Sequence, residues 1–174
     1  MGGIESSFQF LSYKIDSFHL DVTRDVRSLA FGGVIGPSQI QLSFGLRNPL
    51  HISVDNFYVG GLDVQFSLFI SDDFSDANRL ATGRAGVSGL FRVAAEKLAE
   101  ETEKNLVRLQ IPALLFPFLR SAVSSLLINA GFPGVVIPLI NVYELASQVG
   151  DKIQIQEAAA PPATGAIPAK SNSP

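Results

Sequence analysis

Cysteine and tryptophan are absent from this 174-residue sequence, and only two histidines are present. Without cysteine the chain has neither a disulfide framework nor a thiolate metal site. His19 and His51 both lie in strand-like stretches, and neither has a second ligand at a metal-binding spacing. The sequence therefore predicts no metal and no other cofactor.

Clusters of basic residues are also absent. The net charge is −3 and the sequence pI is about 5.3, whereas a nucleic-acid partner requires a basic footprint for its phosphates. No nucleic-acid partner is expected. The first residues, MGGIESSF, show neither the basic nor the apolar region of a secretory signal. Together with the lack of cysteine, this favours a cytoplasmic location.

Three features with some catalytic character do not form an enzyme site. His19 and Asp21 share one strand face, which is typical of a surface pair. The segment 86–89, GVSG, lacks the residue that a nucleophile elbow places between its serine and second glycine. The loop with Asp72, Asp73 and Asp76 lacks the glycine and the final glutamate of a calcium-binding EF-hand loop. We therefore expect no enzymatic activity and a solvated acidic loop tip.

Alternating apolar and polar residues predict four strands joined by short polar connections, which is an antiparallel sheet. The strands are expected at residues 8–22, 40–46, 62–70 and 80–93. The first changes phase near Asp16 and Ser17, which indicates a bulge. Glycines at 83, 86 and 89 indicate close backbone approach to the last strand.

The segments between these strands are predicted with different precision. Residues 24–38 are expected to form a loop because of their Gly-Gly and Gly-Pro steps, and Gly60-Gly61 is expected to form a turn. The stretch from His51 to Val59 fits either a continuation of the second strand or an extra strand.

Two helices are predicted after the sheet. A stripe of small and apolar residues at 95, 98, 102, 106 and 109 indicates an amphipathic helix with a charged outer face. A second helix is expected from Pro112 to Ala130, ended by Gly131 and Pro133. It is apolar nearly all round, so it needs cover on more than one side. We expect a second subunit to supply this cover, at Phe116, Phe118, Ala122 and Ile128.

A membrane span is the alternative reading of the second helix, because Ile111 to Ile128 approaches the required length. Arg120 lies near the centre of this stretch, where a charge costs about 2.5 to 3.5 kcal/mol on insertion scales. Three serines and two prolines also interrupt it. The sequence therefore favours a buried helix of an oligomer over an integral membrane span.

The C-terminal part divides into an ordered portion and a tail. An apolar connector, Phe132 to Ile140, is expected to be extended, and a short helix should follow with Asn141 as N-cap and Gly150 as stop. Residues 158–174 are Ala/Pro-rich without a period, which predicts a disordered tail. The expected organisation is one domain, 1–157, followed by this tail.

Several motifs resemble those of SecB, the bacterial protein-export chaperone family. The fourth strand ends in Gly89-Leu90-Phe91, and residues 114–120, LLFPFLR, resemble the family's apolar-apolar-Phe-Pro-aromatic-x-Arg helix start. Gly131-Phe132-Pro133 and residues 138–142, PLINV, resemble the family's Phe-Pro step and the start of its last helix. Lys14 and Ser17-Phe18 are similar to its first strand. The resemblance extends from about Phe8 to Gln148.

This resemblance implies an α+β fold with helices packed on one face of a four-stranded antiparallel sheet, assembled as a dimer of dimers. It implies a cytoplasmic holdase without ATPase activity that binds unfolded or precursor polypeptides in apolar grooves and delivers them to the SecA translocase motor. The residues expected to contact clients are Phe132, Val136, Leu139 and Tyr143.

Partner docking is less clearly specified by the resemblance. The family's docking acids on the first strand correspond to Ile15 and His19, although Asp16 and Asp21 lie beside them. With Asp72, Asp73 and Asp76 they are the candidate docking acids. Related chaperones that guard an antitoxin are the alternative within the family, and a non-catalytic interaction domain is the alternative outside it.

Overall fold

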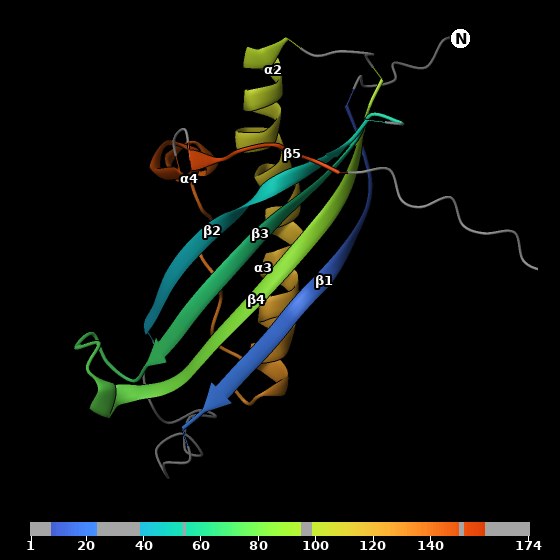
Figure 1. Cartoon of the computed structure of the whole chain (residues 1–174). Coiled ribbons are helices and arrows are strands. Elements are labelled where there is room, and N and C mark those ends of the chain that lie inside the picture. The colour runs from blue at the N-terminus through green and yellow to red at the C-terminus, as the bar shows by residue number, and fades with distance from the viewer. Residues whose placement is uncertain (1–7, 24–38, 54, 95–98, 150–151, 159–174) are drawn as a thin grey trace, which may run out of the picture.

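The computed structural model describes residues 8–23, 39–53, 55–94, 99–149 and 152–158. They form an α+β fold in which a long helix lies against one face of a five-stranded sheet of order β1-β4-β3-β2-β5 (Figure 1). The four long strands are antiparallel to one another where they pair, as predicted. They are β1 (Phe8–Val22), β2 (Gln39–Ile52), β3 (Phe57–Phe69) and β4 (Arg79–Val93), with the short 3-10 helix η2 (Asp76–Asn78) before β4.

The predicted number of strands was wrong by one. The fifth strand, β5 (Gln156–Glu157), pairs in parallel with Leu50 and His51 of β2. Two residues are too few to show the period-2 alternation by which strands are recognised in a sequence. This strand makes the sheet mixed.

The hairpin between β2 and β3 also differs from the prediction. Gly60 and Gly61 lie inside β3, and the chain turns instead between Ile52 and Phe57, where Asn56 has a φ of 53°. No extra strand is therefore formed by His51–Val59, which supplies the end of β2 and the start of β3. Gly60 has a different role: a side chain there would collide with Ile111 of the long helix.

The predicted bulge in β1 is confirmed. Its pairing with β4 shifts between Ile15 and Ser17, and a second shift lies between Phe10 and Ser12. Because each shift inserts one residue, apolar residues on both sides of a bulge keep to the same face of the sheet. Phe10 and Tyr13, on either side of the first shift, both place their rings against Phe118 of the long helix.

A single continuous helical stretch replaces the two helices that were predicted. It consists of α2 (Glu100–Asn105), the π-helical turn η3 (Leu106–Gln110) and α3 (Ile111–Asn129). Pro112 does not begin a new helix. A proline inside a helix lacks a donor and crowds the preceding turn, and the wider π turn lies immediately before it.

The core lies between α3 and the middle strands. The inward side chains of α3 are Ile111, Leu115, Leu119, Val123 and Leu127, each at most 2% exposed. Leu115 approaches the backbone of β4 closely, because a Cβ at Gly89 would lie 2.7 Å from its Cδ2. This confirms close approach at one of the strand glycines. The whole helical stretch, Glu100–Asn129, is long and apolar enough to cross a membrane by length and composition, but here one side of it packs on the sheet.

Both predicted helix signals after α3 are confirmed. Gly131 has a φ of +92°, and the Phe132 amide donates to the Leu127 carbonyl at 2.8 Å, which closes the helix end. The last helix, α4 (Val142–Val149), begins where the Asn141 Oδ1 accepts from the Tyr143 amide at 3.1 Å. Gly150, the loop predicted at 24–38 and the tail beyond Ala158 lie outside the described residues.

Candidate functional site

A groove of about 380 Å³ runs between the edge strand β2 and the helix α4. One wall is β2. The other wall is formed by the end of the connector and by the side of α4 that carries Glu144, Leu145 and Gln148. Its lining residues are Leu42, Ser43, Phe44, Leu139, Ile140, Asn141, Glu144, Leu145 and Gln148. Among the described residues β5 pairs only with Leu50 and His51, so the edge of β2 beside the groove carries no neighbouring strand.

The connector holds apolar side chains in opposite directions. Val135 and Ile137 are buried, whereas Val136 between them is 60% exposed. This alternation is that of an extended chain, as the prolines and glycines predicted. Arg120 of α3 fixes the connector, because its Nε donates to the Ile137 carbonyl at 2.8 Å.

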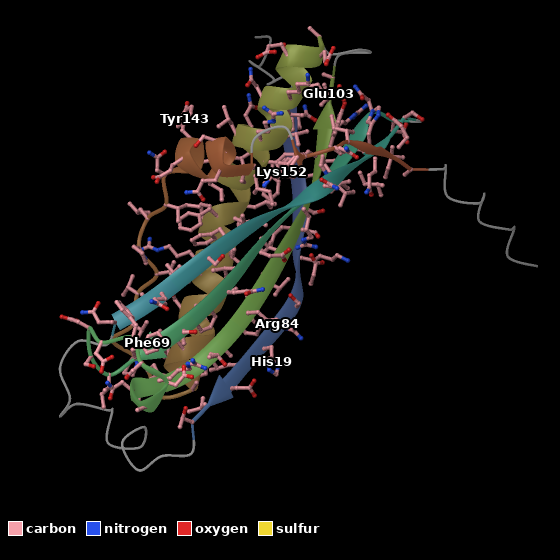
Figure 2. All side chains as sticks on the ribbon, turned by 60° about the vertical axis from the view of Figure 1, so that its left-hand side comes forward. His19, Phe69, Arg84, Glu103, Tyr143 and Lys152 are labelled. Atoms are coloured by element: carbon pink, nitrogen blue, oxygen red, sulfur yellow. The ribbon has the colours of Figure 1, made fainter. Side chains whose placement is uncertain are left out.

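Three of the four residues predicted to contact clients are open to solvent. Leu139 is 78% exposed, Tyr143 74% and Val136 60%, and Figure 2 shows Tyr143 on the outer side of α4, directed away from the sheet. Phe132 is only 1% exposed. It follows Gly131, where the residue after a helix end commonly turns back onto the last helical turn, so its ring is enclosed in the core.

The residues predicted to face another subunit lie in different environments. Phe116 is buried and meets Phe44 edge-on at 6.0 Å, and Phe118 stacks on Tyr13 at 4.1 Å. Ala122 is half-buried, and Ile128 is 55% exposed. The exposed side of α3 instead carries Ala113, Leu114, Pro117, Ser121, Ser125 and Ile128. Taking the core stripe at 115, 119, 123 and 127 as the inner face would have identified this outer face.

Sequence analysis did not predict a second exposed apolar row, on the edge strand β1. The side chains of Leu11, Tyr13, Ile15, Phe18 and Val22 are each between 37% and 48% exposed. Alternation alone marks residues as inward-facing and does not reveal that α3 covers only part of the width of the sheet.

The predicted docking acids do not form one continuous face. Asp16 lies midway along the edge strand β1, 2.7 Å from Nη1 of Arg47, and it also accepts from Ser88. Asp21 pairs with His19 at 2.8 Å, as its place on the same strand face predicted. The other three lie at the β3–β4 connection: Asp73 accepts from Asn78 at 2.8 Å, Asp76 pairs with Arg79, and Asp72 is exposed.

Arg47 is a central side chain that sequence analysis missed. Besides Asp16 it lies 3.1 Å from Asp63 and donates to the Val87 carbonyl at 2.9 Å. Burial acts to raise the pKa of Asp16, but hydrogen bonds from Ser88 and Arg47 outweigh it and hold that pKa below its usual value. The pKa of Asp63 is raised, because its burial outweighs the attraction of Arg47. This network joins four strands on the face opposite α3.

The chemistry of the groove is that of binding. Its lining combines five apolar residues with Ser43, Asn141, Gln148 and one acid, Glu144. Within the described part of the chain no three His, Cys, Asp or Glu side chains gather as a metal site. Apolar area next to an unpaired strand edge is suited to an extended polypeptide, whose backbone and side chains it can meet together.

The fold and the groove thus define an α+β protein with an open groove of mixed polar and apolar lining at a sheet edge. A sequence profile of the family described as "Preprotein translocase subunit SecB" matches residues 79–151, from β4 to just beyond α4. The protein-export protein SecB of Neisseria gonorrhoeae is 30% identical over 89 residues, which are 51% of this chain and 59% of that protein. SecB of Neisseria meningitidis is 29% identical over the same length.

A solved structure has a similar fold. It is a SecB-like chaperone of Mycobacterium tuberculosis in complex with a peptide from the HigA1 antitoxin, with a TM-score of 0.59 and 16% identity, and the match covers 77% of this chain and 91% of that one. Residues 79–151 are thus similar to the SecB family, as the motifs in this part of the sequence predict. It spans 59% of the length of the curated relatives that it matches, and the family profile does not reach β1, where Lys14 and Ser17-Phe18 lie.

Proposed function

We propose that this protein is an ATP-independent holdase chaperone that binds unfolded polypeptides in the groove between β2 and α4. The observation that carries the proposal is the exposure of Leu139, which lines that groove, and of Val136 and Tyr143, which lie on the connector and on α4, the two segments that carry part of its lining. Exposed apolar surface of this kind marks an interaction site. Unfolded chains vary in sequence, so their receptor relies on non-directional burial, which contributes about 25 cal/mol per Å² of apolar area.

The test is suppression of client aggregation, followed by light scattering as a denatured protein is diluted into buffer. A Leu139→Gln/Tyr143→Gln variant should lose most of the protection given by the parent. Neither side chain belongs to the core, so the variant should stay folded. The control is Phe74→Gln, which removes an apolar side chain exposed by 44% that lies outside both the groove lining and the proposed interfaces.

The Phe74→Gln control should protect the client as well as the parent does. Equal protection by the groove variant and the parent would contradict the proposed site. If the parent gives no protection at any ratio of this protein to client, a non-catalytic interaction domain becomes the better interpretation.

We also propose that the protein is cytoplasmic and assembles as a dimer of dimers, through surfaces that no described segment covers. The exposed side of α3 and the apolar row of β1 lie on two different elements, and a homotetramer built from paired dimers needs two different interfaces. Leu114→Glu on α3 and Ile15→Glu on β1 should each reduce the particle mass measured by sedimentation. A parent that is monomeric at micromolar concentration would overturn this part.

The destination of clients is proposed as protein export. The curated relatives are export proteins, and Asp21, Asp72, Asp73 and Asp76 lie outside the Arg47 network, where they remain candidates for a basic surface such as that of the SecA motor. Asp16 is a weaker candidate because it is occupied by Arg47. Binding of such a partner should weaken as salt rises and with Asp72→Lys/Asp73→Lys. Salt-independent binding would show that these acids only solubilise the loop.

Antitoxin protection is the second candidate function. It is favoured by the fold match to a SecB-like chaperone in complex with an antitoxin peptide. Binding measurements with a peptide from an antitoxin encoded beside this protein, set against an export precursor, would separate the two. Tight binding that is confined to the antitoxin peptide would replace the export proposal.

A further inference from the structure

Residues 152–158 form a strap that follows the edge of β2. The Gln154 amide donates to Oδ1 of Asn48 at 3.1 Å, and β5 pairs beside Leu50 and His51. The Ala158 amide donates to the His51 carbonyl at 2.8 Å. Ile153 and Ile155 are half-buried against the core. Figure 1 shows β5 lying against the end of β2 that is nearest to α2.

The His51 side chain joins the strap to the sheet. Its Nδ1 lies 2.8 Å from Oε1 of Glu157, on the strap, and its Nε2 lies 2.9 Å from Oδ1 of Asn56. The orientation of the Asn56 amide is fixed, because its Nδ2 donates to the Val93 carbonyl at 3.2 Å. Both nitrogens of His51 therefore face acceptor oxygens.

Two acceptors require two donors. A neutral imidazole has one N–H and one lone pair, so it can satisfy only one of these oxygens. The imidazolium satisfies both. His51 is only 16% exposed, which shields the contact with Glu157 from solvent on one side. The arrangement selects the doubly protonated form of His51.

The surroundings of His51 are also negative. Its ring stacks on Tyr58 of β3 at 4.5 Å, and the Tyr58 hydroxyl donates to Oε1 of Glu103 on α2 at 2.7 Å. Burial acts to lower the pKa of His51, but the hydrogen bonds to Glu157 and Asn56 and the charges of Glu157 and Glu103 raise it above its usual value.

We propose that His51 is a proton-operated latch that holds the strap 152–158 on the edge of β2. When the imidazolium loses a proton, either Glu157 or Asn56 faces a lone pair, and the strap loses its ionic attachment. Ile153 and Ile155 then hold it with the remaining backbone bonds. Opening would expose the edge of β2 at Leu50 and His51. This inference does not depend on the proposed chaperone function.

The direction of the pH dependence follows from the raised pKa. A group whose pKa is higher in the closed state stabilises that state fully below its ordinary pKa, here 6.5, and the contribution is lost as pH rises through the elevated value. The strap is therefore closed in mildly acidic solution and opens more readily as the solution becomes alkaline. Each pKa unit corresponds to about a tenfold change in the opening equilibrium.

The test measures hydrogen exchange of the Gln154 and Ala158 amides in the full chain from about pH 5 to pH 8, the range in which histidine titrates. Protection factors remove the intrinsic pH dependence of exchange. As the pH rises, the protection factors of the parent should fall in total by about tenfold for each unit by which the pKa of His51 is raised. In Glu157→Gln, an exposed position at which the hydrogen-bond acceptor is retained, and in His51→Gln they should be low and independent of pH.

The second histidine provides the matched control. His19 also faces a carboxylate at 2.8 Å, that of Asp21, but it lies on β1, at the opposite side of the sheet from β5. His19→Gln should keep the parent's pH dependence. Protection in the parent that does not change with pH would overturn the latch, and so would a Glu157→Gln variant that follows the parent.

Discussion

Two apolar surfaces lie on the helical side of this protein. One is buried in the core, and the other is exposed to solvent. Beneath α3 the side chains are closed off, with Leu115 at 0% and Leu119 at 1% exposure. On the connector and α4 they are open, with Leu139 at 78% and Tyr143 at 74%. Both sets read as equally apolar in the sequence. The difference shows that cover by a neighbouring element, rather than composition, decides which apolar segment is core and which is available for binding.

Cover depends on how closely each element approaches the sheet. Gly60 and Gly89 remove side chains that would collide with Ile111 and Leu115, so α3 lies directly on β3 and β4. Among the described glycines, none makes comparable room for a side chain of the connector. The Arg120 bond to Ile137 holds it, and a groove remains between α4 and β2. The open surface is therefore a consequence of where the glycines are placed.

The largest effect should come from the closed surface. Leu115→Ala removes a fully buried side chain and leaves a cavity, so the free energy of unfolding should fall by about 2 to 5 kcal/mol. Chemical denaturation at a fixed protein concentration measures this change. Leu139→Ala is the matched control and should stay within about 0.5 kcal/mol of the parent. Similar losses in both variants would erase the distinction between the two surfaces.

A smaller effect should come from the bond between the two surfaces. Arg120→Met keeps much of the side-chain length but removes the donor to the Ile137 carbonyl. A hydrogen bond from a charged group contributes about 1.5 to 3 kcal/mol, and its loss should also speed hydrogen exchange in residues 132–140. The control is Arg84→Met, because Arg84 is exposed on the other face of the sheet (Figure 2). Unchanged exchange in the connector would show that other contacts hold it.

The smallest effect should come from the start of α4, which forms the outer wall of the groove. Asn141→Ala removes the side-chain acceptor for the Tyr143 amide and should cost about 1 kcal/mol, the usual value of an N-cap. Thermal unfolding followed by circular dichroism measures this loss. Asn141→Ser retains a capping oxygen and should restore most of it. Failure of Ser to restore stability would mean that the cap does not hold this wall.

Much of the fold was predictable because its signals are local. Four alternating strands, the bulge near Asp16, the stop at Gly131 and the cap at Asn141 each depend on residues close together in the chain. The errors arose where distant contacts decide. Gly60 and Gly61 read as a turn, but Gly60 makes room for Ile111 of α3. Pro112 read as a helix start, but the helix continues through a π turn.

The candidate site was predictable only in part, for the same reason. The extended connector and the exposure of Val136 and Leu139 follow from the local alternation of residues. The burial of Phe132 and Phe116 does not, because it depends on which neighbour each ring meets across the fold. Arg47 was missed because its partners, Asp16, Asp63 and Ser88, come from three other strands. No spacing in the sequence brings these residues together.

The measurement that tests the central claim most directly is site-specific photo-crosslinking to an unfolded polypeptide. A photoreactive residue is placed at position 139 or 143 for the open surface, and at position 74 as an exposed apolar control outside the groove and the proposed interfaces. Our account predicts strong crosslinks to the unfolded polypeptide from 139 and 143, weak ones from 74, and none to the same polypeptide once folded. Crosslinks of equal strength from all three positions, or none from 139 and 143, would contradict it.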